Sequence, residues 1–407
     1  MSIAPDEHLP SYAERAKLLR HLQRLKMTRS AHAYVRGSTA KFYEWLDASA
    51  GKVPEGPAIW ICGDCHSGNL GPLADSKGKV AIQIRDFDQT VIGNPAHDLI
   101  RLGLSLATAA RGSNLPGVTT ALMVEQMVEG YEAGLRGSDR HPGRADRIPK
   151  EVRRVLRQSL RRRWKDLARE RIDDPRPTIP MGKRFWPLTE RERGAIRLLA
   201  NGEGFRRLVT LVHSRRDDAE VEVLDGAYWM KGCSSLGRLR YAILAGLKDA
   251  DGTTETCLID IKESVVAAAP RARGIAMPKS EAARVVRGAR ALSPFLGERM
   301  LAGRLLERPV VMRELTPQDL KLEIETLSRL EAVRAAHYLA SVVGRAHARQ
   351  MPPDTRGAWL KELGRNRSAT LDAPSWLWAS LVELVMTHEA AYLEHCRLYA
   401  QELGAAA

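Results

Sequence analysis

The chain has 407 residues, of which 44% are hydrophobic and 28% are charged. This composition is that of a globular protein and excludes an intrinsically disordered one, and the length is large for a single core, so we expect two lobes. The 63 Lys and Arg against 49 Asp and Glu give a net charge of +14. Such a charge favours anionic partners, such as nucleotides, phosphorylated metabolites, nucleic acid or acidic lipid surfaces, without selecting among them.

The sequence carries no signal for export or membrane insertion. Its first residues lack the basic and then apolar layout of a secretory signal, and no apolar run approaches the roughly 20 residues that cross a bilayer. The five cysteines form an odd and scattered set, which fits a reducing compartment better than a disulfide framework. We therefore expect a cytoplasmic protein without a membrane span, and the composition is compatible with any oligomeric state.

The first part of the chain is predicted to be helical around two short strands. Apolar residues recur at helix-like spacing over about 8–50, and a second apolar helix is expected over Asp98–Ala110. Between them, 58–62 and 80–84 are predicted as buried strands, with a turn at Asp75–Gly78 joining them.

The character of the chain changes after about residue 205. An Arg-rich amphipathic helix at about 149–172 precedes the change. Beyond it we expect a small antiparallel sheet with turns at Asp225-Gly226 and Asp251-Gly252, and one helix from about 279 to 292. From about 320 the chain is again predicted to be helical. The predicted strands are 220–224, 240–245, 256–262 and 309–315.

The most informative stretch is Gly-Asp-Cys-His-Ser-Gly-Asn at 63–69, which is followed by Asp-Phe-Asp at 86–88. Kinase-type phosphotransferases need one carboxylate that orients and deprotonates the attacking hydroxyl. They also need an amide oxygen and a second carboxylate that hold magnesium. We therefore interpret Asp64 as the catalytic base and Asn69 and Asp86 as magnesium ligands. Asp88 is a candidate ligand for a second ion.

A nucleotide-binding region is predicted downstream. The segment Lys231–Gly237 lies between two strand-like runs, and about 25 residues later Lys262 ends a third. This is the order of Gly-rich loop, strand, turn and strand with lysine in the small lobe of a kinase, although Ser234 replaces the middle glycine. The residues expected to bind the phosphates of ATP are Gly232, Ser234, Ser235, Gly237 and Lys262.

Candidates can also be named for two further features of the small lobe of a kinase: the glutamate that fixes the lysine, and the hinge. Glu281, on the following predicted helix, is the best candidate to fix Lys262, and Glu263 is a weaker one because it alternates away from that lysine. The strand 309–315 would then be the hinge, whose backbone around Met312 to Glu314 could bind the edge of adenine.

The segment Gly-Asn-Pro-Ala-His-Asp-Leu at 93–99 resembles the Gly-Asp-Pro-x-x-Asp-Leu segment of aminoglycoside and choline phosphotransferases. This resemblance implies that Asp98 is a buried structural aspartate. It also implies a catalytic-loop role for His66, since small-molecule kinases carry a histidine at that place.

Most of the chain resembles the bacterial family called domain of unknown function 2252. That resemblance implies a circularly permuted relative of the kinase-like fold and does not imply a substrate. Ala31 and His32 depart from it, where a Pro-Phe pair is expected. The resemblance is carried by 30–37, 63–71, 86–88, 98–102, 261–264, 284–288 and 346–349.

We therefore predict an α+β, circularly permuted, two-lobed protein-kinase-like fold. A larger helical lobe would comprise 1–200 and 318–407, and a small antiparallel β lobe would comprise 201–317. The predicted function is ATP- and magnesium-dependent phosphoryl transfer to a hydroxyl of a small molecule, anionic acceptors included. Nucleotidyl transfer by the same site and a non-catalytic, kinase-like role remain open.

Three other interpretations are weaker. Cys62-x-x-Cys65 has the spacing of a redox or zinc motif but lacks the context of either, so packing is favoured. The Asp64-x-His66 pair resembles dinuclear metallophosphoesterases, but Pro95 interrupts the later Gly-Asn-His element that those enzymes need. The Arg-rich helix at 149–172 is a candidate nucleic-acid surface, although a solvated face is the more common role.

Overall fold

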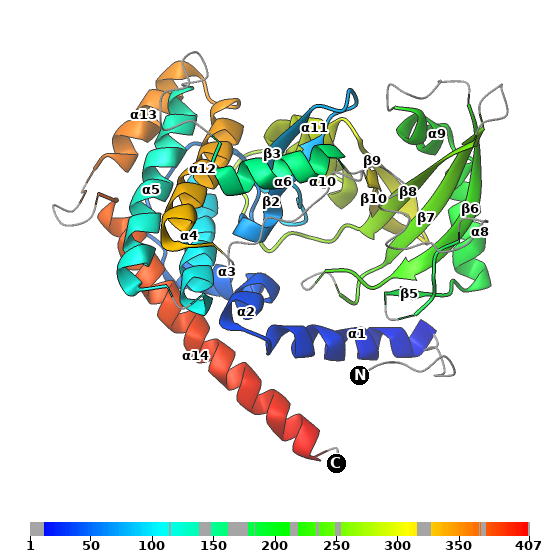
Figure 1. The fold of residues 1–407 in the computed structure, drawn as a ribbon, viewed down its shortest axis with the longest axis horizontal. Coiled ribbons are helices and arrows are strands. Elements are labelled where there is room, and N and C mark those ends of the chain that lie inside the picture. The colour runs from blue at the N-terminus through cyan, green and yellow to red at the C-terminus, as the bar shows by residue number, and fades with distance from the viewer. Residues whose placement is uncertain are drawn as a thin grey trace.

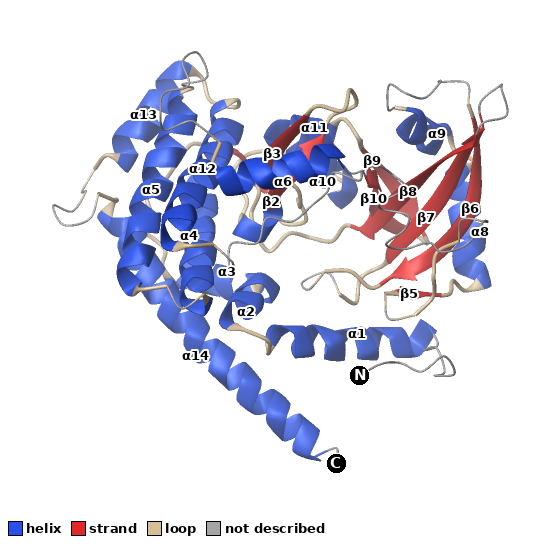
Figure 2. Cartoon of the chain, viewed as in Figure 1, coloured by secondary structure: helices blue, strands red, loops and turns tan. Residues whose placement is uncertain are grey.

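The protein, represented by a computed structural model, combines helices with an antiparallel sheet (Figures 1 and 2). A group of helices lies on one side and a six-stranded sheet on the other, with two small two-stranded ladders among the helices. The predicted α+β class is thus confirmed. The residues that the structure describes are 12–113, 115–137, 148–161, 178–182, 184–211, 219–232, 236–248, 254–315, 327–365, 367 and 372–405.

The helical part is built from both ends of the chain, and helices α5 and α12 pack closely in it. The predicted helix over Asp98–Ala110 is confirmed as the inner portion of α4. Of the Arg-rich helix predicted at 149–172, the portion beyond 161 lies outside the described residues. The helices are α2 (Ala31–Gly37), α3 (Thr39–Ala48), α4 (Pro95–Gly112), α5 (Gly117–Arg136), α6 (Lys150–Arg161), α12 (Arg329–Ala348), α13 (Pro353–Leu363) and α14 (Ser375–Ala405).

Two short ladders lie between these helices. The predicted strands β1 (Ile59–Ile61) and β3 (Val80–Ile84) both form, but they do not pair with each other. Instead β1 pairs with β4 (Val91–Gly93), and β3 pairs with β2 (Leu70–Ala74), which the sequence did not predict. The turn at Asp75–Gly78 therefore closes the β2–β3 hairpin, because a turn this short can join only adjacent strands.

The six strands of the large sheet are all antiparallel and lie in the order β5-β6-β7-β8-β10-β9. The predicted turn at Asp225-Gly226 is wrong, because β6 continues through it with a bulge between Val223 and Asp225. The turn predicted at Asp251-Gly252 lies outside the described residues. The strands are β5 (Phe185–Trp186), β6 (Glu220–Trp229), β7 (Arg240–Lys248), β8 (Thr254–Glu263), β9 (Met300–Leu305) and β10 (Arg308–Leu315).

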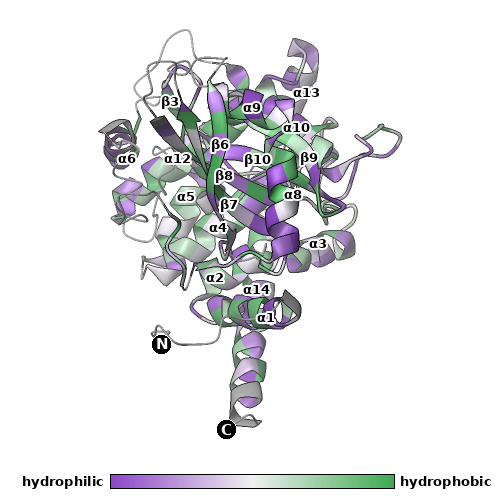
Figure 3. Ribbon diagram, turned by 90° about the vertical axis from the view of Figure 1, so that its right-hand side faces the viewer, coloured by the Kyte–Doolittle hydropathy of each residue, from purple (hydrophilic) through white to green (hydrophobic). Residues whose placement is uncertain are grey.

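The two faces of the sheet bury different residues. The outer face packs against α8 (Glu190–Ala200) and α9 (Glu203–Thr210), and the inner face is turned toward the helical part. Strands β6, β7 and β8 accordingly mix hydrophobic and hydrophilic residues along their length (Figure 3). Strand β5 is part of the sheet, and helices α8 and α9 pack on it. The part of the chain that forms the sheet and its helices therefore begins before residue 201, where the boundary was predicted. Helices α10 (Glu281–Leu292) and α11 (Pro294–Gly297) connect β8 to β9.

Helix α1 (Tyr12–Met27) joins the sheet to the helical part (Figure 1). On the sheet side, Arg15 forms a buried ion pair with Glu192 of α8, at 2.9 Å, and Lys26 Nζ donates to the carbonyl of Gly232, at 3.0 Å. On the helical side, Tyr392 of α14 donates its hydroxyl to the carbonyl of Thr28 at 2.9 Å, just beyond the end of α1. Within the described part of the chain, no helix combines the length and apolar character needed to cross a bilayer.

Glycines allow α5 and α12 to touch backbone to backbone. A Cβ added to Gly130 would lie 2.0 Å from the carbonyl oxygen of His337, and one added to Gly344 would lie 2.2 Å from that of Tyr131. Such distances cannot be relieved by rotating a side chain, because the obstacle is backbone. The close approach of these helices therefore depends on glycine.

We expect Gly130→Ala to destabilise the protein by about 2 kcal/mol or more, because the added methyl group forces α5 and α12 apart. The measurement is the urea midpoint of unfolding. Gly357→Ala on α13 is the matched control: no atom lies within 4 Å of its added Cβ, so the higher helix propensity of alanine should stabilise it by up to about 1 kcal/mol. An equal gain for both variants would contradict the packing account.

Candidate functional site

The loop after β1 is held by one buried carboxylate. Asp98, in the first turn of α4, accepts hydrogen bonds from the backbone amides of Cys62, at 2.7 Å, and Gly63, at 2.9 Å. Gly63 has a φ of 76°, and a Cβ there would lie 2.2 Å from the carbonyl oxygen of Gln89. Only glycine fits this turn, so the loop leaves β1 in one fixed direction.

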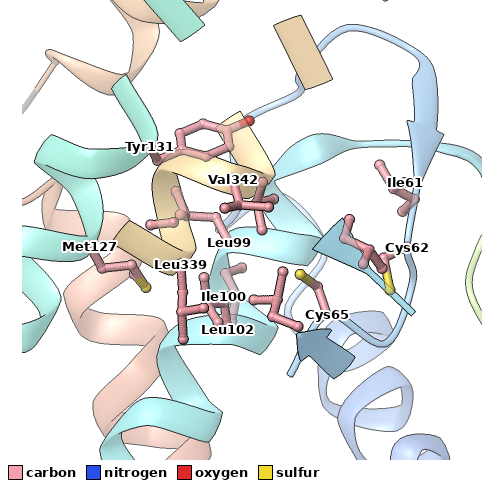
Figure 4. Close-up of a cluster of buried hydrophobic side chains, with 14 of the residues drawn as sticks. Ile61, Cys62, Cys65, Leu99, Ile100, Leu102, Met127, Tyr131, Leu339 and Val342 are labelled. Atoms are coloured by element: carbon pink, nitrogen blue, oxygen red, sulfur yellow. The ribbon is translucent and has the colours of Figure 1, made fainter. Parts of the chain in front are cut away.

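Asp98 is itself held by a chain of buried polar groups. His347 Nε2 of α12 lies 3.1 Å from Asp98, and its Nδ1 lies 2.8 Å from the hydroxyl of Tyr131. That hydroxyl also accepts from the indole of Trp359 at 3.2 Å. Tyr131 lies in the apolar cluster that also contains Cys62 and Cys65 (Figure 4). The resemblance-based prediction of Asp98 as a buried structural aspartate agrees with this placement.

Asp64 lies next in the loop and faces the helical part. Its Oδ1 accepts from Arg101 Nε of α4 at 2.8 Å, and its Oδ2 accepts from Thr39 Oγ1 of α3 at 3.0 Å. The guanidinium of Arg101 is fully buried and also donates to the carbonyl of Val35 at 2.6 Å. The carboxylate of Asp64 is therefore fixed in orientation and has a cationic partner.

His66 is buried beside Arg36 of α2. Burial, and then the positive charge of Arg36, hold the pKa of His66 well below its ordinary value, so the ring is neutral at physiological pH. Its Nδ1 is buried and has no hydrogen-bond partner among the described residues. Gly68 makes room for both groups, since a Cβ there would lie 3.0 Å from the Arg36 guanidinium and 3.1 Å from the His66 ring.

The β2–β3 hairpin brings Asn69 beside Arg85, the residue before Asp86. Asn69 immediately precedes β2, and the amide of Arg85, just after β3, donates to its carbonyl at 2.8 Å. The side-chain amide of Asn69 donates to the carbonyl of Asp64 at 2.8 Å, which leaves Oδ1 of Asn69 available to a ligand. Strand pairing thus ties Asn69 to the residue that precedes Asp86 in the chain.

Lys262, on β8 of the sheet, reaches Asp86 and Asp88 of the helical part. Its Nζ lies 3.3 Å from both carboxylate oxygens of Asp86 and 2.6 Å from Oδ2 of Asp88. Burial raises the pKa of Asp86, but Lys262 and two nearby arginines outweigh it and hold that pKa well below its ordinary value. Burial and the neighbouring Asp86 raise the pKa of Asp88. The three groups form one tightly coupled ionic contact between the two parts.

The structure adds three residues that the sequence did not indicate. Asp260, two positions before Lys262, binds Arg240 through two bonds of 2.9 and 2.6 Å, and Arg313 lies 3.4 Å from it. Directly paired residues of adjacent strands point to the same face, and Arg240 is opposite Lys262 while Arg313 is opposite Asp260. We call Arg240, Asp260 and Arg313 the ionic triad. The period of two along β8 could have placed Asp260 beside Lys262, but not its partners.

These groups line a cavity between the sheet and the helical part, which we call the central cavity. It has a volume of about 40 Å³, enough for an ion or a water molecule but far below the 300 Å³ or more of a pocket for a nucleotide-sized ligand. The cavity must open before such a ligand can enter. Its lining residues are Arg85, Asp86, Phe87, Asp88, Arg240, Asp260, Lys262, Ser264, Val285, Met300, Val311 and Arg313.

The predicted phosphate loop is described at both ends. Gly232 and Gly237 have φ values of 96° and 95°, which favour glycine, while Ser234 and Ser235 lie outside the described residues. Arg238, immediately after the loop, binds Asp88 with 3.2 Å between Nη1 and Oδ2. The end of the loop is thus next to the central cavity, whereas Asp64 and His66 do not line it.

Two sequence-based assignments of the small lobe are wrong. Glu281 does not pair with Lys262: it binds Arg284 and Arg271, whereas Lys262 binds Asp86 and Asp88. Glu263, the weaker candidate, instead accepts from the amide of Leu239 at 2.8 Å and pairs with Arg308.

The hinge assignment also fails for Met312. Strand β10 lies between β8 and β9, so Met312 is opposite Ile261 on one side and Leu301 on the other, and its backbone has no open edge. Its side chain is buried on the outer face. Glu314 lies one residue beyond the last pair with β9 but is still opposite Ile259 of β8.

The Cys62-x-x-Cys65 motif forms part of the core. Both cysteines are fully buried, and the hydrogen bond with Cys65, together with burial, raises the pKa of Cys62 well above its usual value. With Asp98 they form a group whose potential ligand atoms lie within 4.8 Å of one another. Because Asp98 already binds two backbone amides and His347, packing explains the motif better than a metal does.

We expect Asp98→Asn to destabilise the protein by about 3 kcal/mol, because an amide cannot accept from both loop amides and His347 at once. The measurement is the thermal midpoint together with the urea midpoint. Asp47→Asn is the control: Asp47 is exposed on α3, so its loss should cost less than about 0.5 kcal/mol. Equal stability of the two variants would show that Asp98 does not hold the loop.

We expect His66 to weaken the fold in acid. The unfolded chain binds a proton at this histidine below about pH 6.5, whereas the folded protein resists it, so stability falls as the pH decreases from that value. His66→Gln should flatten the decline, measured as the free energy of unfolding between pH 7 and 5. An unchanged slope in His66→Gln would contradict the buried neutral ring.

Comparison with known proteins identifies a family. Neither a curated protein nor a solved structure matches the chain significantly. A family model described as an uncharacterized protein conserved in bacteria, DUF2252, matches residues 15–398. Because this match spans the loop after β1, the central cavity and nearly all of the sequence, the chain belongs to the bacterial family DUF2252.

Proposed function

We propose that the protein is an ATP- and magnesium-dependent phosphotransferase that acts on a hydroxyl of a small molecule. The observation that carries this proposal is the contact of Lys262 with Asp86 and Asp88. Residues more than 170 positions apart meet at one cavity, with Asn69 and Asp64 in the adjoining loop. Phosphoryl transfer needs this set: a lysine for the phosphates, oxygen ligands for magnesium and a carboxylate for the acceptor.

The order of elements supports a kinase-like fold. In protein kinases the phosphate-binding lysine lies on the third strand of the small lobe, after a Gly-rich loop, and a helix follows it. Here β6, the loop at 231–237, β7 and β8 precede α10, and Lys262 is on β8. Because the elements of the catalytic loop come first and the helical part is formed by both ends of the chain, we infer a circular permutation with two lobes.

The donor set near Asp86 fits magnesium. Magnesium prefers oxygen ligands and is commonly held by one or two carboxylates together with substrate phosphates. The side chain of Asp86 is 42% exposed, and the hydrogen bond of Asn69 to the carbonyl of Asp64 uses its side-chain nitrogen and not its Oδ1. When bound there, magnesium would neutralise charge on the transferred phosphoryl group. Asp88 is available for a second ion once Lys262 and Arg238 release it.

The chain's own residues would then have distinct tasks. Lys262 would leave the two aspartates and bind the α- and β-phosphates, while the loop at 232–237 would cover the phosphate chain. Asp64, held by Arg101 and Thr39, would orient the acceptor hydroxyl and take its proton. The positive charges of Arg101, which binds Asp64, and of Arg36, which lies near His66 in the same loop, favour an anionic acceptor. A cytoplasmic location agrees with such a substrate.

Other functions receive less support. Nucleotidyl transfer would use the same residues and differs only in the phosphorus attacked. A dinuclear phosphoesterase is disfavoured, since among the described residues the only three-residue cluster at metal-ligand distance is that of Cys62, Cys65 and Asp98. A scaffold without catalysis is disfavoured by the presence of Asp64, Asn69, Asp86 and Lys262 together. Nucleic-acid binding by α6 rests on its arginines alone.

We expect Asp86→Ala to lower turnover at least about 10²–10³-fold, because the phosphates lose their metal ligand. The readout is transfer from ATP labelled at the γ-phosphate to a metabolite mixture, with ATP labelled at the α-phosphate as the test for nucleotidyl transfer. Asp372→Ala, at a surface residue paired with Arg367, is the matched control and should keep full activity. Full turnover in Asp86→Ala would refute the assigned ligand.

Binding alone separates an enzyme from a scaffold that binds no nucleotide. The proposal expects ATP to raise the thermal midpoint when magnesium is present and to raise it little without magnesium, since the aspartates repel phosphates until a cation neutralises them. If magnesium and ATP together leave the midpoint unchanged, the proposed function is wrong.

A further inference from the structure

We propose that the central cavity recognises the phosphate chain of its donor and not the base, so that inorganic tripolyphosphate and different nucleoside triphosphates bind almost equally well. This inference rests on the proposed function, which assigns the cavity to the phosphoryl donor. It concerns the part of the sheet beside Lys262, where a purine would have to lie if the base were bound.

The first observation is the charge of that surface. The inner face of the sheet next to Lys262 carries the ionic triad, in which Asp260 is 2% exposed and Arg240 is 6% exposed. Binding sites for flat organic rings are mostly apolar with a few polar groups that fix orientation. A base placed on the triad would strip water from ion pairs without replacing its hydrogen bonds, which is unfavourable.

The second observation is that the apolar surface further along this face is already covered. Leu258 and Leu315 continue the inner face beyond the triad, and they pack in a cluster with Ile179, Phe185 and Trp229. The ring of Trp229 stacks on Phe185 at 5.6 Å, and Arg240 lies 5.1 Å from its centre. These rings are therefore occupied within the fold and offer no open platform for a purine.

The third observation is that the neighbouring backbone is paired. Over Arg308–Arg313, strand β10 is paired with β9, and from Val310 onward it is also paired with β8. Met312, which was predicted to bind the edge of adenine, is therefore enclosed on both sides and cannot read a base through its backbone.

The cavity is instead suited to phosphate. Among the described residues its lining contains four cationic side chains, Arg85, Arg240, Lys262 and Arg313, against three carboxylates. If magnesium binds the two carboxylates near Asn69, Asp260 alone opposes the four cations. Arg313 also bridges the two parts, because its Nη1 donates to the carbonyl of Arg85 at 3.2 Å. Guanidinium groups bind phosphate oxygens through paired hydrogen bonds.

The reaction does not require the nucleobase of the donor. The bond between the terminal phosphorus and its bridging oxygen breaks, and the bridging oxygen leaves with the shortened polyphosphate. A new bond forms between that phosphorus and the acceptor oxygen, and the proton of the acceptor passes to Asp64. The phosphate chain and the acceptor supply everything that the reaction consumes, and the metal is not consumed.

The test is isothermal titration calorimetry of the full chain with magnesium and, in turn, ATP, GTP, tripolyphosphate and adenosine. We expect the three triphosphates to bind within about threefold of one another and adenosine not to bind measurably. A preference of tenfold or more for ATP over both GTP and tripolyphosphate would overturn the inference and leave the proposed function intact. If no triphosphate binds, both are wrong, whereas equal binding without any phosphoryl transfer refutes only the function.

Substitutions of arginines test which part of the ligand the cavity recognises. Arg313→Gln should weaken ATP and tripolyphosphate together by about tenfold, the usual effect of losing one charge-assisted hydrogen bond, and Arg313→Lys should weaken them less. Arg304→Gln is the matched control, since Arg304 is 70% exposed on β9 and pairs with Glu307. A loss in Arg313→Gln that is confined to ATP would show that the arginine reads the nucleoside, against the inference.

Discussion

The site depends on one buried carboxylate. Asp98 accepts the amides of Cys62 and Gly63 and a bond from His347, so it ties the loop after β1 to α4 and α12 together. A buried anion with three donors is stable only when all of them are present. The positions of Asp64 and Asn69 follow from this anchor, because both lie in the loop that starts there. The backbone contact of α5 with α12 in turn fixes the helix that carries His347.

The second determinant of the site is the balance of charge between the two parts of the protein. Lys262, Arg238 and Arg313 of the sheet part each bind a group at 85–88. These contacts hold the two parts together around the central cavity of about 40 Å³. A metal and a phosphate chain would supply the same charges in a different arrangement, with the cation at the aspartates and the anion at the lysine. Under the proposed function, opening of the cavity and binding of the ligand would therefore exchange these ionic partners.

Local patterns in the sequence predicted the elements well, and distant pairing less well. The apolar runs at 59–61 and 80–84 and the helix of Asp98 form as expected, because burial and capping act within a few residues. The partner of each strand was not predictable, since β1 pairs with β4 across 30 residues. A turn signal at Asp225-Gly226 was misleading because the same residues suit a bulge.

The candidate site residues show the same difference: those in local motifs could be predicted, and those that depend on distant contacts could not. Motif spacing was enough to find the loop at 63–69, the aspartates at 86 and 88 and Lys262, and the structure brings Asp86, Asp88 and Lys262 to one place. Glu281 was misassigned because the direction of a lysine side chain depends on which charges face it across the cavity. Arg101, Arg240 and Arg313 carry no motif, and only their contacts reveal them.

Helix α1 constrains how the protein can move. It is attached to the sheet through Arg15 and Lys26, and the residues just after it are attached to α14 through Tyr392. Helix α14 also contacts α1 itself, at the carbonyl of Arg24 and at His21. Rotation of the sheet away from the helices must therefore break contacts on one side of α1. Because Lys26 holds the carbonyl of Gly232, α1 also connects the helical part to the start of the predicted phosphate loop.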